Sequence, residues 1–284
     1  MIHVTTRRIE IESLPLEFPI LLQSDVHILS PSTQIPIIKR ELQLARKKGA
    51  RILINGDLFD AILPGDLKRY APSGVSVHAD NIINLAIEQA VDLYGPYADL
   101  IDMVSLGNHE GSALKHSSVN LIELFINRLN EKCGNVSYGG FAGYVVYRFF
   151  YGKRSTGCYR IRYHHGSGGA APVTKGIIDL TRMATWTIDA DMIWIGHKHN
   201  QLWTPCQVER ISAADRVYEK TINAVMTGGY MSQLETTEEG YATKSNMPHQ
   251  PKGGAFVDLL VKSKPPRETG PYLEVSVDTF KWSA

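Results

Sequence analysis

Five short segments of the chain carry side chains that could hold metal ions, and they contain six of its ten histidines. These segments are Asp25-Val26-His27, Gly56-Asp57, Gly107-Asn108-His109-Glu110, His164-His165-Gly166 and Gly196-His197-Lys198-His199. Carboxylates and imidazoles together suit divalent manganese, iron, cobalt, nickel or zinc. Two such ions about 3.5–4 Å apart can promote attack on phosphorus, so the pattern predicts phosphoester hydrolysis.

Asp57 is the natural bridge between two ions, because a carboxylate has two oxygens to share. The glycine before it lets the backbone turn sharply out of a strand. Asp25 and His27 are two positions apart, and in an extended segment such side chains point the same way. We expect the same geometry at His197 and His199.

Each of these segments follows a predicted strand. The buried strands are expected at 18–23, 51–55, 101–106 and 192–195, and a hairpin at 144–150 and 157–163 leads to His164. Reactive groups gather at the carboxyl ends of strands in layered α/β folds, because loops converge there over a rigid sheet. The five segments should therefore meet at one place.

Helices with apolar stripes are expected between the strands. One is predicted to start at Ser32 or Thr33 and to end at Gly49. Others are predicted from Asp80, from Val119 to an end at Gly134, and at 177–188. After residue 205 the pattern is mostly strand. We therefore predict an α/β fold with a single domain over 1–284, catalytic segments at 25–199 and a β-rich part at 205–284.

The amino-acid composition is typical of a soluble globular protein. The chain has 284 residues, and its 30 basic and 29 acidic residues give a net charge of +1. Nucleic-acid-binding proteins usually have a basic surplus, although a local basic patch is compatible with a neutral total. The three cysteines are sparse, the chain starts without the apolar run of a signal peptide, and no segment reaches the ~20 apolar residues of a membrane span. We expect a cytoplasmic protein with no membrane contact.

The order of the five segments resembles the calcineurin-like metallophosphoesterases. That family shows Asp-x-His, Gly-Asp, Gly-Asn-His-(Asp/Glu), His and Gly-His-x-His, and residues 25–199 contain all five in this order. The resemblance implies a four-layer α/β-β/α sandwich with mixed sheets and a two-metal site.

Ligands are also implied by the resemblance. One ion would be held by Asp25, His27, Asp57 and His199. The other would be held by Asp57, Asn108, His197 and either His164 or His165, with His164 preferred. His109 corresponds to the family histidine that contacts the scissile phosphate and protonates the leaving oxygen, so the catalytic set is His109, Asn108 and Asp57. Glu110 is expected to support a ligand or His109.

The expected activity is that of a dinuclear-metal phosphodiesterase in which metal-bound hydroxide attacks phosphorus in line. Manganese is the first choice of metal, with zinc, iron, nickel or cobalt as alternatives. The segment Gly56-Asp57-Leu58-Phe59-Asp60 resembles the SbcD-type nucleases, and other stretches resemble phage and prophage members of the superfamily, which would place the protein in a host cytoplasm. The substrate would be a phosphoester, with DNA or a nucleotide as candidates. The alternatives are a nuclease and a non-catalytic binding module that retains the fold.

Other polar features have simpler interpretations. Lys68, Arg69 and Lys175 could grip a substrate phosphate, but solvated surface charges are the simpler interpretation. The run Gly166-Ser167-Gly168-Gly169 is interpreted as the rim of an active site. Substrate fit is expected to depend on the loop at 63–79 and on the polar stretch at 235–253.

Overall fold

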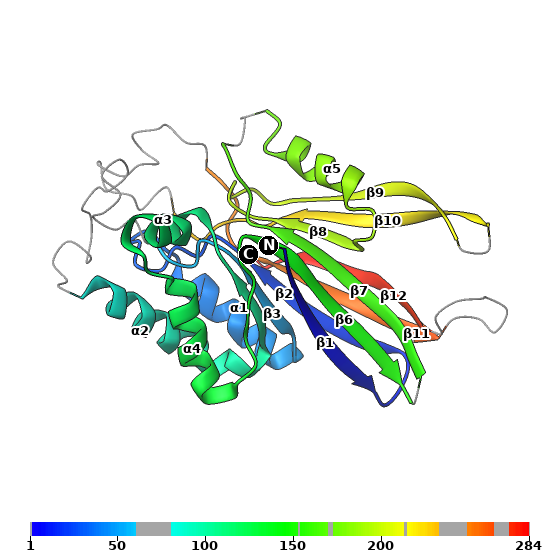
Figure 1. Ribbon diagram of the computed structural model, residues 1–284, viewed down its shortest axis with the longest axis horizontal. Coiled ribbons are helices and arrows are strands. Elements are labelled where there is room, and N and C mark those ends of the chain that lie inside the picture. Colours follow the sequence, from blue (N-terminus) through cyan, green and yellow to red (C-terminus); the bar gives the residue numbers. More distant parts are fainter. Residues whose placement is uncertain are drawn as a thin grey trace.

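Two six-stranded mixed sheets form the centre of the protein, and helices cover their outer faces (Figure 1). The computed structural model describes residues 2–60, 81–152, 154–169, 173–212, 215–232, 249–263 and 273–283. The loop expected at 63–79 and most of the stretch expected at 235–253 lie outside these ranges. The expected α/β class with mixed sheets is confirmed.

The first sheet, sheet B, has the strand order β12-β11-β2-β3-β4-β5. Its central strands β2, β3 and β4 run parallel, and β11 and β12 add an antiparallel edge. The strands are β2 (Leu16–Gln23), β3 (Arg51–Asn55), β4 (Ile101–Ser105), β5 (Ser137–Tyr138), β11 (Ala255–Ser263) and β12 (Leu273–Trp282). Strands β2 to β4 are nearly continuous apolar runs, as parallel strands covered on both faces must be.

The second sheet, sheet A, has the strand order β1-β6-β7-β8-β10-β9. It joins the predicted hairpin β6–β7 to the parallel pair β7–β8. The strands are β1 (His3–Ile11), β6 (Ala142–Tyr151), β7 (Arg154–His164), β8 (Met192–Ile195), β9 (Leu202–Ile211) and β10 (Val217–Met226). The β-rich part beyond 205 thus divides between the two sheets.

Helices form the two outer layers. They are α1 (Ile35–Lys48), α2 (Ile82–Tyr94), the 3-10 helix η2 (Gly95–Leu100), α3 (Asn108–Ser117), α4 (Leu121–Cys133) and α5 (Ile177–Trp186). One apolar cluster joins α1, α2 and α4 to the outer face of sheet B, and a second joins α5 to sheet A. A third fills the space between the sheets, so the layers are helix, sheet, sheet and helix. In the described ranges every helix is too short or too polar to serve as a transmembrane span.

Helices α1 and α3 differ most from the sequence predictions. Helix α1 begins after Gln34, and no side chain caps it. Thr33 instead donates its hydroxyl to the carbonyl of His27, at 2.6 Å, which ties the helix start to a candidate ligand segment. Helix α3 was not predicted, because only Ala113 among its apolar side chains is buried. The predicted ends at Gly49 and Gly134 are confirmed, with both glycines in the left-handed conformation.

A buried carboxylate, Asp102 on β4, links the two sheets. It is 0% exposed and lies in ion pairs with Arg7 of β1 at 2.7 Å and with Arg51 of β3 at 2.5 Å. The hydroxyl of Tyr147 on β6 donates to the same carboxylate at 2.8 Å. Because β1 and β6 belong to sheet A, this one charge holds both sheets in register.

Replacing Asp102 by alanine should lower the free energy of unfolding by ~3–5 kcal/mol, because two partly buried guanidinium groups would lose their counterion. Urea denaturation followed by circular dichroism measures this. Asp99→Ala is the matched control, since its pair with Arg46 is about half exposed and such pairs contribute ~0–1 kcal/mol. Equal losses in the two variants would contradict the linking role of Asp102.

Candidate metal centre

The candidate ligands lie just beyond the ends of five strands. Asp25 follows β2, Asp57 follows β3 and Asn108 follows β4, each by two or three residues. In sheet A, His164 ends β7, and His197 follows β8 by two residues. Ion-pair and ring contacts join residues of all five loops, so the predicted convergence is found.

Five of these residues have a left-handed backbone. The φ angles are 55° at Asp25, 54° at His27, 49° at Asp57, 68° at His197 and 53° at His199. The pairs Asp25/His27 and His197/His199 were expected to be extended. They are not, so extended geometry is not what brings their side chains together. A non-glycine residue in this conformation costs of order 1 kcal/mol, and such strain concentrates at functional sites.

Hydrogen bonds between the loops hold this strained backbone. The N–H of Asp25 donates to the carbonyl of Gly56 and the N–H of His27 to that of Asp57, both at 3.0 Å. The buried Glu110 carboxylate accepts the N–H groups of Asp57, Phe59 and Gly107 at 2.8–3.1 Å. As expected, Glu110 supports a ligand, and it does so through the backbone around Asp57.

Two glycines permit the close approach of the loops. A Cβ atom at Gly107 would lie 2.1 Å from Oδ1 of Asp57. Gly56 has a φ of 74°, and a Cβ atom there would lie 2.5 Å from Nδ1 of His165. A side chain at either position would therefore displace a candidate ligand.

The first group of ligand atoms comes from Asp25, His27 and His199, and these atoms lie within 4.8 Å of one another. Nε2 of His199 is 3.4 Å from Oδ1 of Asp25. The Asp25 carboxylate is fully buried, and it is oriented by the hydroxyl of Ser24 and by the backbone N–H of His197. Its remaining lone pairs face the imidazoles.

The second group comes from Asp57, His165 and His197. Nε2 of His165 lies 3.1 Å from Oδ2 of Asp57 and 3.2 Å from Oδ1 of Asn108. Nδ1 of the same ring lies 2.8 Å from the carbonyl oxygen of Asn55, which makes Nδ1 the protonated nitrogen. Nε2 is then the atom that would bind a cation together with the two oxygens.

A third group, made by His27, Asp57 and His109, overlaps the other two. It shares His27 with the first group and Asp57 with the second, so the cluster is continuous. His109 donates its backbone N–H to Oδ1 of Asp57 at 2.9 Å. Oδ1 of Asp57 thus accepts a backbone hydrogen bond, whereas Oδ2 faces His165.

Electrostatics within the cluster favour ionised carboxylates. Burial raises the pKa of Asp57, but His165 and the other imidazoles more than offset this and hold it well below its ordinary value. Burial and the nearby His109 lower the pKa of His27 to about 4. His27 is thus neutral at pH 7, which is the form that binds metals.

Two buried nitrogens show that the residues fit a metal. His27 is 1% exposed, and among the described residues neither Nδ1 nor Nε2 has a hydrogen-bond partner. A buried polar atom without a partner costs about 1–3 kcal/mol, so native structures rarely keep one. A cation beside the Asp25 and Asp57 oxygens would satisfy one of these nitrogens.

The structure brings His165 into the cluster and leaves His164 outside it, although the sequence favoured His164. Nδ1 of His164 accepts the backbone N–H of Gly166 at 2.8 Å. Alternate residues of a strand point to opposite faces, and Tyr163 points into the space between the sheets. His164 therefore points outward from β7, and His165 takes its place among the candidate ligands.

Asp60 was not given a role by the sequence. Its Oδ1 lies 3.2 Å from Nδ1 of His109 and 3.9 Å from Nδ1 of His27. Burial lowers the pKa of His109, but Asp60 and Asp57 reverse this effect and raise it to about 9. The spacing Gly-Asp-x-x-Asp was the available signal.

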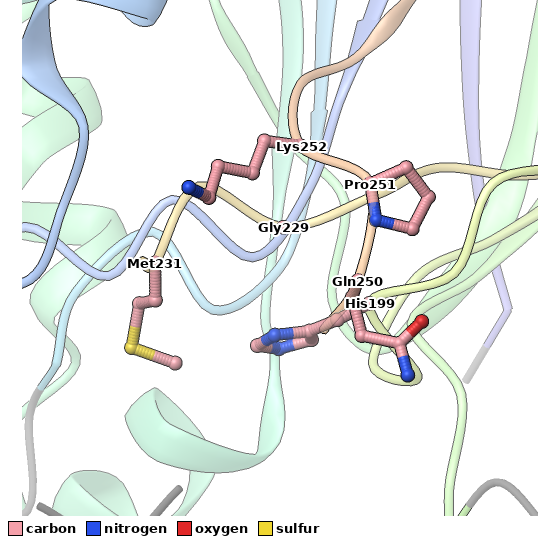
Figure 2. A pocket seen from close by; sticks show the side chains of 6 residues that line it. All are labelled: His199, Gly229, Met231, Gln250, Pro251 and Lys252. Carbon is pink, nitrogen blue, oxygen red and sulfur yellow. The ribbon is translucent and has the colours of Figure 1, made fainter. Parts of the chain in front are cut away.

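A pocket opens beside His199 (Figure 2). It is lined by His199, Gly229, Met231, Gln250, Pro251 and Lys252. In Figure 2 the His199 ring lies between the Met231 thioether and the Gln250 amide. This pocket was also missed, because its walls come from separate segments with no common motif.

The remaining polar candidates are exposed or lie outside the described ranges. Lys175 is exposed, as are Ser167, Gly168 and Gly169 at the predicted rim. Lys68 and Arg69 lie outside the described residues.

Comparisons with known proteins identify no family. No family model and no curated protein matches the chain. Among solved structures, a conserved uncharacterised protein of Streptococcus pneumoniae TIGR4, described as a predicted phosphoesterase, is 11% identical, with 92% of this chain and 98% of that chain covered and a TM-score of 0.34.

Two further structures are similar at the same low level. GAP50, the anchor in the inner membrane complex of Plasmodium, is 12% identical over 93% of this chain and 89% of its own, with a TM-score of 0.43. A hypothetical protein of Thermus thermophilus is 14% identical over 92% of this chain and 100% of its own, with a TM-score of 0.35. Similarities this weak assign no function, so function is argued from the residues of the site.

Manganese should stabilise the protein, by ~2.7 kcal/mol at a concentration 100-fold above the dissociation constant. His27→Leu should lose most of this gain while metal-free stability stays the same or rises, because the ring nitrogens of His27 have no hydrogen bond to lose. Thermal unfolding with and without manganese measures both effects. His116→Leu, at an exposed histidine of α3, should keep the full gain. A full gain in His27→Leu would contradict the ligand role.

Proposed function

We propose that this protein is a dinuclear-metal-dependent phosphoesterase of the calcineurin-like type, acting on phosphodiesters. The observation that carries the proposal is the set of three overlapping ligand groups, in which the His27–Asp57–His109 group shares His27 with one neighbouring group and Asp57 with the other. Asp25, His27, Asp57 and His199 would hold one ion, and Asp57, Asn108, His165 and His197 the other. Manganese is the preferred metal, and zinc, iron, cobalt or nickel are chemically compatible.

When bound, two such ions would supply Lewis acidity and lower the pKa of coordinated water toward ~7. The chain itself supplies the other half of the chemistry. Nδ1 of His109 faces Asp60, which leaves Nε2 as the atom that donates a proton to the leaving oxygen. A raised pKa keeps His109 protonated at neutral pH, the state that a general acid needs.

Asn108 and Asp57 position the reacting groups. Asn108 starts helix α3, so its side chain and the N–H groups of the first turn lie beside the cluster. Partial positive charge at a helix start favours anions such as a phosphate oxygen.

His109→Ala should reduce kcat on bis-p-nitrophenyl phosphate by about 100-fold or more in manganese, because general acid help typically contributes ~10²–10⁴-fold. Metal binding, followed by thermal stabilisation, should persist. His116→Ala should keep full activity. If the metal-loaded wild type cleaves only the monoester p-nitrophenyl phosphate, the diesterase assignment fails. If it cleaves neither ester, the non-catalytic alternative is favoured.

Asp60→Asn should move the alkaline limb of the pH–rate profile to lower pH by about 1 unit or more, because a neighbouring carboxylate raises the pKa of an imidazole. The active form of His109 is protonated, so activity falls as pH rises through its pKa. Removing the Asp60 charge lowers that pKa and brings the fall earlier. Profiles of kcat for wild type, Asp60→Asn and the exposed control Asp99→Asn measure the shift. An unmoved limb in Asp60→Asn would refute the coupling.

A further inference from the structure

The outer face of sheet A is covered over only one half of its width. Helix α5 packs on β8, β9 and β10. In the part of the chain that the structure describes, Figure 1 shows no helix over the outer face of β1 and much of that of β6 and β7, although Val146 is only 7% exposed and Tyr144 packs against the α5 cluster. Val4 on β1 is 65% exposed there.

Strand alternation decides which side chains lie on this open face. Val145, Tyr147 and Phe149 of β6 point into the core between the sheets, and so do the residues of β7 at 159, 161 and 163. Their neighbours therefore point outward. The outward side chains are Val4, Thr6, Arg8, Glu10, Tyr144, Val146, Arg148, Phe150, Cys158, Arg160 and Arg162.

Four of these outward residues are arginines, against a single acidic residue. Arg8 is paired with Glu10, at 2.5 Å, and lies directly opposite Arg148 in the sheet register. Like charges opposite each other on adjacent strands destabilise a sheet. Arg148, Arg160 and Arg162 have no carboxylate on the same face to balance their charges. This face is therefore suited to binding an external anion.

Two of the arginines lie against aromatic rings of the same face. The guanidinium of Arg8 is 3.7 Å from the ring centroid of Phe150, and that of Arg162 is 5.3 Å from the ring centroid of Tyr144. Arginine interleaved with aromatic rings is the composition of surfaces that hold nucleic-acid strands, where it binds phosphates and stacks on bases.

The other two arginines are available to a ligand. Among the described residues, the side chains of Arg148 and Arg160 make no hydrogen bond or ion pair, whereas Arg162 donates to the carbonyls of Gly143 and Tyr163. Arg148 is exposed and Arg160 is half-buried. Their charges cost little to redirect toward a bound phosphate.

The row of charges leads to the metal centre. Arg160, Arg162 and His164 alternate along β7, so they lie on one face at intervals of about 6.7 Å. The next residue, His165, belongs to the ligand cluster. A polyanion lying along β7 would therefore reach the candidate ions with one end.

We propose that the open face of β1, β6 and β7 binds a single-stranded nucleic acid and leads its backbone to the metal centre. The proposal rests on the proposed phosphoesterase activity, which would act on the bound nucleic acid, and it specifies the class of substrate. The phosphates of the nucleic acid lie on the arginines, and its bases stack on the aromatic rings and the guanidinium planes.

The test compares binding with chemistry. Arg148→Gln/Arg160→Gln should weaken binding of a labelled single-stranded oligothymidylate at least ~tenfold at low salt, and the slope of log affinity against log salt should fall by about 0.7 for each contact removed. Fluorescence anisotropy measures both. Hydrolysis of bis-p-nitrophenyl phosphate should stay unchanged in this variant, because that small diester does not reach the face.

The matched control is Arg40→Gln/Arg128→Gln, two exposed arginines on α1 and α4 at the far side of sheet B. It should bind the oligonucleotide as the wild type does. The proposal is overturned if the wild type does not bind the strand, if both double variants bind equally well, or if the arginines are needed only for binding to phosphatidylserine vesicles. Arginine-dependent binding without any diester hydrolysis would support this face and refute the proposed function instead.

Discussion

The Asp57 carboxylate is the constraint on which the site depends. It is 2% exposed and lies near a second buried carboxylate, Asp25, which is 0% exposed. Two buried negative charges are expensive unless cations or donors surround them. Imidazoles of His27, His165, His197 and His199 enclose the pair, and a cation bound among them would balance the two negative charges further.

Around this charge the backbone is arranged to bring donors inward. Left-handed conformations at the ligand residues turn their side chains toward the cluster, at a cost in strain. Glu110 offsets part of that cost by binding three backbone N–H groups, and Thr33 holds the loop of His27. The two sheets supply the rigid support, and Asp102 keeps them in register.

Charge is distributed unevenly over a chain whose net charge is only +1. Among the described residues five carboxylates are buried, and Asp25, Asp57 and Glu110 of these lie at the ligand cluster, whereas four arginines lie on the uncovered half of sheet A. The two features lie close in sequence, because Arg160 and Arg162 are on β7 and His165 of the cluster follows its last residue.

The amino-acid sequence alone determined the ligand types, the strands before them and the helix ends at Gly49 and Gly134, since these depend on local chemistry and on hydrophobic periodicity. It could not separate His164 from His165, because that choice depends on which face of β7 each residue takes and on the carbonyl of Asn55, 110 positions away. The partner of His109 and the open face of sheet A likewise follow from contacts between distant segments. Only the packing of two sheets decides such contacts.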